Sequence, residues 1–297
     1  MLFVHVILPV FIIVLAGYAL QRRARLDLRP LTECSLYLFT PALVFSALLR
    51  RELHPDLVGQ LTLFMIAYTA AMTALAVLMA RTWCLDGNAG RALVLTTAMM
   101  NVGNFGLPLV MFAYGAAALD VSILTFVLFN IPLGTLAIVV AQGNGTGWGE
   151  AVCNALRIPI FHAVLLALLC KGVGWLPPEF ILRPTELVGQ AAVPVMLVLL
   201  GMQLARAGIG RGWVFCGAAT VLRLAVAPLM AIGLTALFGI DGLARKVLIL
   251  QTSTPAAVLT LLYAVRFNTK PELVAGTIFL STLASALSLT VLLYWLG

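Results

Sequence analysis

The chain has 297 residues, of which 62% are hydrophobic and only 10% are charged, and its mean hydropathy is +1.09. Soluble domains carry about 25% charged residues, so this composition excludes an ordinary soluble protein and indicates an integral membrane protein. The net charge of +7 does not indicate a nucleic-acid-binding protein, because the basic residues stand singly or in short clusters at the ends of apolar runs.

Apolar runs long enough to cross a bilayer follow one another along the whole chain. The first has no basic segment before it and is followed directly by Arg22, Arg23 and Arg25, so it is predicted to be a retained helix and not a signal peptide. We predict an all-α integral membrane protein with about ten transmembrane helices. They are expected at residues 2–21, 30–49, 57–80, 89–115, 118–141, 153–175, 184–206, 212–238, 242–266 and 272–296.

The distribution of basic residues predicts the orientation in the membrane. Most of the 18 Lys and Arg residues fall in connections that are cytoplasmic if the N-terminus lies outside. We therefore expect a multi-pass membrane protein with both termini external.

A Gly-rich linker at residues 142–150 separates two sets of five predicted spans, at 1–141 and 151–297. Proline positions repeat across it, Pro41 with Pro194 in the second span of each set and Pro108 with Pro255 in the fourth. An odd number of spans per copy places the second copy upside down, so we predict an inverted 5+5 repeat.

Two of the predicted spans contain residues that interrupt a helix. The fourth contains the stretch Asn101–Pro108, with two Asn and two Gly before the Pro, and the ninth contains Gln251–Pro255. Paired breaks of this kind indicate the binding site of a transporter. We expect Pro108 and Pro255 each to begin a second half-helix, with caps from Asn104 or Gly106 and from Ser253 or Thr254.

Half-helix N-termini at the middle of the membrane would favour an anionic group. The predicted substrate-binding residues are Asn101, Gly103, Asn104, Gly106, Pro108, Gln251, Thr252, Ser253, Thr254 and Pro255. The alternative for the first break is a Gly/Pro kink in which the Asn side chains pair helix to helix.

Arg223 lies deep in the eighth predicted span and has two interpretations. It is either a counter-charge for an anionic substrate or a structural residue that reaches backbone carbonyls or the interface.

Asn130, two residues before Pro132, fits helix packing better than a binding role. All 11 acidic residues lie in loops or near span ends, which favours a carrier driven by the membrane potential over a proton- or sodium-coupled one.

We expect no cofactor and no metal site, because the five cysteines form no C-x-x-C pair and the three histidines lie far apart. The expected partners are a small organic anion and the lipid bilayer, without nucleic acid, and a homodimer remains open. An intramembrane enzyme is disfavoured by the absence of H-E-x-x-H and G-x-S-x-G motifs.

The same residues resemble the auxin efflux carrier family, meaning the plant PIN proteins and their bacterial relatives. The resemblance implies a location in the bacterial inner (plasma) membrane. The matching stretches are Leu38–Ser46, Asn101–Pro108, Leu199–Gln203, Val221–Pro228 and Gln251–Glu272. The resemblance implies a scaffold domain from spans one, two, six and seven, with Pro41, Phe45 and Gln203 on the scaffold side. It also implies a transport domain in which Asn101, Pro108 and Pro255 form a crossover of two broken helices.

The resemblance implies organic anions as substrates, either indole-type acids or small dicarboxylates such as malate and malonate. The chain lacks the long hydrophilic loop of the plant members, and no Asn stands beside Pro255, so the plant preference does not transfer. The predicted function is a secondary transporter that exports or exchanges such anions by alternating access. The alternatives are a sodium-coupled symporter of the bile-acid symporter type and a channel or receptor with the same breaks.

Overall fold

A computed structural model describes residues 3–50, 55–143, 149, 153, 156–207 and 212–297. All regular elements in these ranges are helical. The first half contains η1 (Phe3–Ile7), α1 (Leu8–Ala24), α2 (Arg29–Cys34), η2 (Ser35–Phe39), α3 (Thr40–Arg50), α4 (Pro55–Thr82), α5 (Gly87–Thr97), η3 (Val102–Gly106), α6 (Leu107–Tyr114), α7 (Ala116–Gly134) and α8 (Leu136–Gln142). The second half contains α10 (Pro159–Gly172), α11 (Glu179–Gln190), α12 (Ala192–Arg206), α13 (Trp213–Val221), η4 (Leu222–Val226), α14 (Ala227–Leu237), α15 (Gly242–Thr252), α16 (Leu259–Arg266) and α17 (Pro271–Leu296).

Seven continuous helical stretches in the described residues are long and apolar enough to cross a membrane. They are Phe3–Ala24, Arg29–Arg50, Pro55–Thr82, Ala116–Gln142, Glu179–Arg206, Trp213–Leu237 and Pro271–Leu296. The predicted span 153–175 corresponds to the shorter helix α10, and the predicted spans 89–115 and 242–266 each consist of two helical pieces. Most of the predicted linker at 142–150 lies outside the described residues.

Prolines shape the helices through short π-helical segments. The four segments η1, η2, η3 and η4 each end two residues before a proline, namely Pro9, Pro41, Pro108 and Pro228. Proline has no N–H to donate, and its ring clashes with the carbonyl one turn earlier. A local π-helical turn changes the hydrogen-bond spacing at that point, so the helix continues through the proline.

The helix that leads to the first break is capped at its start. The Asp86 carboxylate accepts a hydrogen bond from the backbone N–H of Ala89 at 2.8 Å. This bond lowers the pKa of Asp86, and the Lys270 ammonium, 3.6 Å away, acts in the same direction. The cap fixes where α5 starts.

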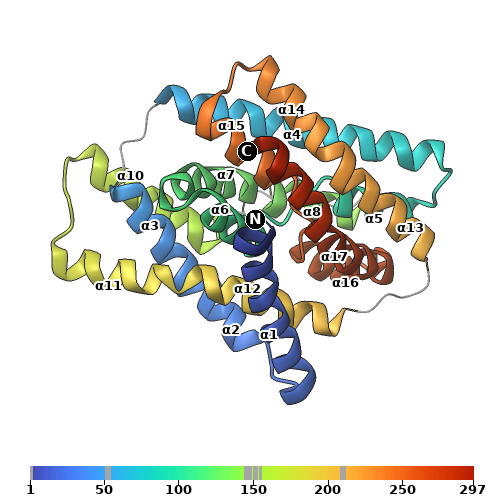
Figure 1. Ribbon diagram of the computed structural model, residues 1–297, viewed down its shortest axis with the longest axis horizontal. Coiled ribbons are helices and arrows are strands. Elements are labelled where there is room, and N and C mark those ends of the chain that lie inside the picture. Colours follow the sequence, from blue (N-terminus) through green and yellow to red (C-terminus); the bar gives the residue numbers. More distant parts are fainter. Residues whose placement is uncertain (1–2, 51–54, 144–148, 150–152, 154–155, 208–211) are drawn as a thin grey trace.

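The helices form two groups on either side of the breaks (Figure 1). In one group α1 packs against α12, and α3 packs against α10 and α11. In the other, α4 packs against α5 and α7, α13 against α17, α14 against α15 and α4, α15 against α7 and η3, and α16 against α17. The helices of the first group come from the predicted spans at 2–21, 30–49, 153–175 and 184–206.

The closest helix packing within the first group involves α1 and α12. A Cβ atom on Gly201 would lie 1.9 Å from the Val14 carbonyl oxygen, and one on Gly17 would lie 2.3 Å from the Val198 carbonyl oxygen. Glycine at both positions lets the two backbones touch, as small residues do in membrane helix pairs.

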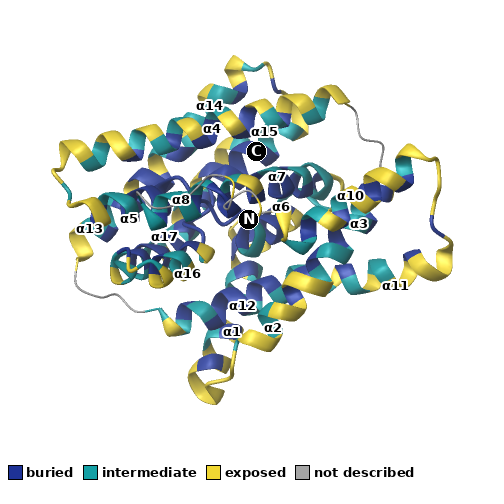
Figure 2. Cartoon of the chain, turned by 180° about the vertical axis from the view of Figure 1, so that it is seen from behind, coloured by how far each residue is buried: buried dark blue, intermediate teal, exposed yellow. Residues whose placement is uncertain are grey.

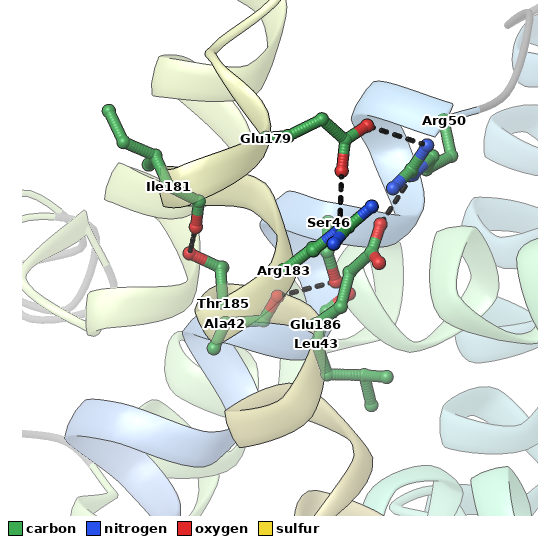
Figure 3. Close-up of polar contacts among 9 residues, drawn as sticks. All are labelled: Ala42, Leu43, Ser46, Arg50, Glu179, Ile181, Arg183, Thr185 and Glu186. Atoms are coloured by element: carbon green, nitrogen blue, oxygen red, sulfur yellow. Dashed lines mark hydrogen bonds and ion pairs between the residues drawn. The ribbon is translucent and has the colours of Figure 1, made fainter.

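Charged residues connect α3 to α11 at one end of this group (Figure 3). The Arg50 guanidinium contacts the carboxylates of Glu186 and Glu179, and Arg183 donates to Glu179 at 3.1 Å. Because these side chains are largely exposed, the pairs contribute orientation and little stability.

Burial follows the expected pattern of a membrane protein (Figure 2). Buried residues concentrate at the centre, whereas large apolar side chains are exposed on outer faces. On α17 the exposed residues Leu283, Leu287, Val291 and Tyr294 recur at helical spacing. Such a stripe is unfavourable in water and is suited to lipid.

Candidate binding site at the two helix breaks

The first break covers residues 98–101. Helix α5 ends at Thr97, and Asn101 has φ −88° and ψ 61°, outside the helical region. The helix resumes at Val102, so the expectation that Pro108 begins the second half-helix is wrong. The π-helical turn η3 accommodates Pro108 inside the helix, and neither Asn104 nor Gly106 makes a side-chain cap.

The second break covers residues 253–258. Helix α15 ends at Thr252, and α16 begins at Leu259, four residues beyond Pro255. The hydroxyls of Ser253 and Thr254 donate back to the carbonyls of Ile249 and Gln251. They therefore terminate α15, and the expectation that they cap a helix beginning at Pro255 is wrong.

The two breaks pair with each other through their backbones. The Asn101 N–H donates to the Pro255 carbonyl at 2.9 Å, and the Ala257 N–H donates to the Met99 carbonyl at 3.0 Å. These bonds form an isolated antiparallel bridge between Met100 and Ala256, both fully buried. Each unwound segment thus satisfies backbone groups of the other, as buried backbone away from water requires.

The C-terminal ends of α5 and α15 meet at Arg223, which is fully buried. Its guanidinium donates to the carbonyls of Thr97 at 2.9 Å and Thr254 at 2.8 Å, and also to the carbonyl of Thr252. It further donates to the Tyr68 hydroxyl at 3.1 Å. Arg223 does not line the cavity described below, so this geometry favours the structural interpretation over the counter-charge.

A cavity of about 550 Å³ lies on the other side of the paired breaks, between the two helix groups. Its polar lining includes Asn101, Asn104 and Asn130 from one group and Gln203 and Arg206 from the other. The remaining lining residues are Leu28, Thr32, Ser35, Leu36, Thr40, Met100, Val102, Gly103, Phe126, Leu133, Ile158, Ile160, Met196, Leu199, Ala207, Ala257, Val258, Leu259, Leu261, Leu262 and Val265. The described lining is therefore mainly apolar, with the hydroxyls of Thr32, Ser35 and Thr40, several amides and one cation.

The cavity collects only part of the residue set expected from the sequence. Asn101, Gly103, Asn104 and Gln203 line it. The residues outside its lining are Pro41, Phe45, Gly106, Pro108, Arg223, Gln251, Thr252, Ser253, Thr254 and Pro255. From the second break, residues 257–259 line the cavity instead, whereas residues 251–255 are buried and do not line it.

Gln251 illustrates this interior role. It is fully buried, and its side-chain amide donates to the Ser122 carbonyl at 3.0 Å. It joins the end of α15 to α7, so it positions the break and does not face the cavity.

Sequence reasoning missed Arg206 and undervalued Asn130. Arg206 is the C-terminal residue of α12, and its guanidinium donates to the Leu26 carbonyl at 2.6 Å. The sequence presents it as one of several span-end charges, and nothing in its spacing distinguishes it. The Asn130 amide donates to the Phe126 carbonyl at 2.7 Å, as helix packing predicts, yet Asn130 also lines the cavity.

A profile of the family described as Membrane transport protein matches residues 2–147 and 149–293. The chain belongs to this family. It is the auxin efflux carrier family that the sequence resembles, and it is a family of transporters and not of enzymes.

Two relatives of this membrane transport protein are archaeal. An uncharacterized transporter of Methanothermobacter thermautotrophicus is 29% identical over 288 residues, covering 95% of each chain. An uncharacterized transporter of Methanocaldococcus jannaschii is 26% identical over 304 residues, covering 98% of this chain and 96% of the relative. The similarity therefore extends over both breaks and both helix groups.

Two polar atoms of this membrane transport protein stand out in the cavity wall. The amide nitrogen Nδ2 of Asn101 and the amide oxygen Oε1 of Gln203 are buried and make no hydrogen bond within the described residues. Buried polar atoms are nearly always paired, so unpaired ones at a cavity indicate a place for a ligand.

Proposed function

We propose that the protein is a secondary transporter that carries small organic anions by alternating access around the two paired breaks. The observation that carries this proposal is the cavity at the crossing, into whose wall Asn101 brings an unpaired amide donor. The proposal includes the ten-span inverted repeat of residues 1–141 and 151–297. Its support is that each half contains one broken span and that the breaks pair antiparallel.

The electrostatics of the crossing favour an anion on the cavity side. The helix that starts at Val102 and the helix that starts at Leu259 both begin at the cavity lining. Helix starts present free N–H groups and the positive end of the helix dipole. Asn101 and Asn104 add neutral donors, and the described lining contains no Asp or Glu.

Arg206 adds the one full positive charge among the described lining residues. It is the last residue of α12, and its guanidinium donates to the Leu26 carbonyl. No Asp or Glu lies near it in the sequence. An arginine in this position would attract a carboxylate into the cavity and then remain beside it. The mainly apolar remainder of the lining suits a solute that has an apolar body behind its carboxylate.

Alternating access is supported by the position of the cavity between the two helix groups. Movement of the group with the breaks relative to the α1, α3, α10, α11 and α12 group would carry the lining from one face to the other. Arg206 and the Arg22–Arg25 cluster lie at the ends of α12 and α1, which are packed together. The proposal places both termini outside. This end of α1 and α12 is then cytoplasmic, and the cavity opens toward the cytoplasm.

The sodium-coupled alternative has less support. No carboxylate lies in the described cavity lining, and the carbonyls at the helix breaks already surround Arg223.

The flux assay for the proposal is uptake of radiolabelled carboxylic acids into proteoliposomes, with an imposed membrane potential and in sodium or choline buffer. We expect saturable, potential-driven flux of at least one organic anion in both buffers. Flux of neutral or cationic solutes alone would contradict the proposal.

Replacement of Arg206 tests the charge of the cavity. We expect Arg206→Gln to raise the KM for the transported anion about tenfold, the size of a lost charge-assisted bond. The maximal rate should change much less, because Arg206 is the last residue of α12 and does not belong to either break. Arg266→Gln, an arginine that packs over Phe267 outside the cavity lining, serves as the control. An equal effect of both changes would remove Arg206 from the site.

A further inference from the structure

Arg223 is a buried charge without an acidic partner. It is 0% exposed, and no Asp or Glu forms an ion pair with it within the described residues. Its partners are three backbone carbonyls and the Tyr68 hydroxyl, which itself donates to the Thr252 carbonyl at 2.9 Å. A charge inside a membrane protein is expensive, so this one marks a function.

The surrounding oxygens belong to the ends of broken helices. Thr97 is the last residue of α5 and Thr252 the last residue of α15, so their carbonyls lack intrahelical donors. Both helices direct the negative ends of their dipoles at the guanidinium. In transporters with broken helices, such C-terminal ends and unwound carbonyls are where a coupling cation binds.

We propose that the Arg223 guanidinium is a tethered cation that occupies the place of a coupling ion at the crossing. The helix starts then face an anionic substrate in the cavity, while the helix ends face a positive charge that cannot dissociate. The transport cycle therefore runs without sodium or another coupling cation at this position. Removal of the side chain leaves a ring of carbonyl and hydroxyl oxygens that binds a small monovalent cation.

The form of the side chain fits this role. Guanidinium is planar, carries its charge at every accessible pH and has five N–H donors. Three of its nitrogens reach Thr97, Thr254, Thr252 and Tyr68. One residue thus holds α4, α5 and α15 together at the crossing. The inference rests on the proposed function for its consequence for flux, but the cation site itself is tested without any substrate.

The test is the thermal stability of purified Arg223→Ala in choline, sodium, potassium or guanidinium chloride. We expect the wild type to have the same unfolding temperature in choline and in sodium. The variant should unfold at lower temperature in choline, and about 100 mM sodium or potassium should raise its unfolding temperature by roughly 5 °C. Guanidinium at about 10 mM, far below denaturing concentrations, should do the same.

Two further variants keep the test decisive. Arg223→Lys retains a tethered charge, so its stability should not depend on sodium. Arg266→Ala removes an arginine that lies outside the crossing and should respond to no cation. The proposal is overturned if wild-type stability depends on sodium, if Arg223→Lys becomes sodium-dependent, or if Arg223→Ala gains nothing from any small cation. Failure of the flux assay alone would contradict the proposed function and leave these results standing.

Discussion

Asn101→Ala is expected to reduce anion flux at least tenfold while the protein still folds and inserts. The flux loss follows because Nδ2 of Asn101 has no partner within the described residues and lies in the cavity wall, where it can donate to a carboxylate. A hydrogen bond to a charged group is worth about 1.5–3 kcal/mol, which corresponds to roughly 10- to 100-fold in affinity. Folding should survive because the backbone N–H of residue 101, which pairs with Pro255, is also present in alanine.

The measurement is the initial rate of uptake into proteoliposomes, normalised to the amount of reconstituted protein. Asn88→Ala is a matched control, since Asn88 lies on the same helix-break-helix segment but is exposed and accepts a hydrogen bond from Arg91. It should transport at the wild-type rate. If Asn101→Ala transports at that rate too, Asn101 does not contact the solute and the cavity needs another donor.

Gly201→Ala is expected to cause the largest loss of stability. The new Cβ would lie 1.9 Å from the Val14 carbonyl oxygen, which is backbone and cannot rotate away. Helices α1 and α12 would have to separate, and overpacking of this kind costs about 3 kcal/mol. We therefore expect poor accumulation in the membrane and a strongly lowered unfolding temperature of whatever protein is recovered.

Gly233→Ala provides the comparison, because a Cβ at that position has no heavy atom within 4 Å. The substitution lies on an outer helix and should change the free energy of unfolding by less than about 0.5 kcal/mol. Similar behaviour of the two variants would mean that α1 and α12 do not pack as closely as the structure has them.

The approximate positions of the two breaks were predictable from the sequence. The first and last residue of each break, and the antiparallel pairing between them, were not. Asn, Gly and Pro in the fourth span and Thr-Ser-Thr-Pro in the ninth identify both interruptions, because these residues weaken a membrane helix. The start of the helix after the first break was not predictable, because the π-helical turn η3 begins at Val102 and the helix continues through Pro108. Local sequence does not reveal whether a proline begins a helix or is absorbed by a wider turn.

The binding site was only partly predictable for a similar reason. Asn101 and Asn104 belong to a conspicuous motif and line the cavity. Arg206 resembles any other span-end arginine, and it reaches the cavity only because α12 packs beside the first break. Arg223 was recognised as unusual from its depth in an apolar run. Its partners come from three distant segments, at Tyr68, at Thr97 and at residues 252–254, so its role required the tertiary structure.

A disulfide cross-link between the two breaks tests most directly whether they pair as described. Met100 and Ala256 form the antiparallel bridge without direct hydrogen bonds between them, a pairing that places Cα atoms about 4.5 Å apart, within disulfide range. The five native cysteines are replaced by alanine, and Met100→Cys with Ala256→Cys is oxidised in intact membranes. Met99→Cys with Ala256→Cys is the control, because a shift of one residue points the side chain to the opposite face. We expect a nearly complete intramolecular cross-link between residues 100 and 256 and little in the control pair. Absence of that cross-link in folded protein would contradict the pairing of the two breaks.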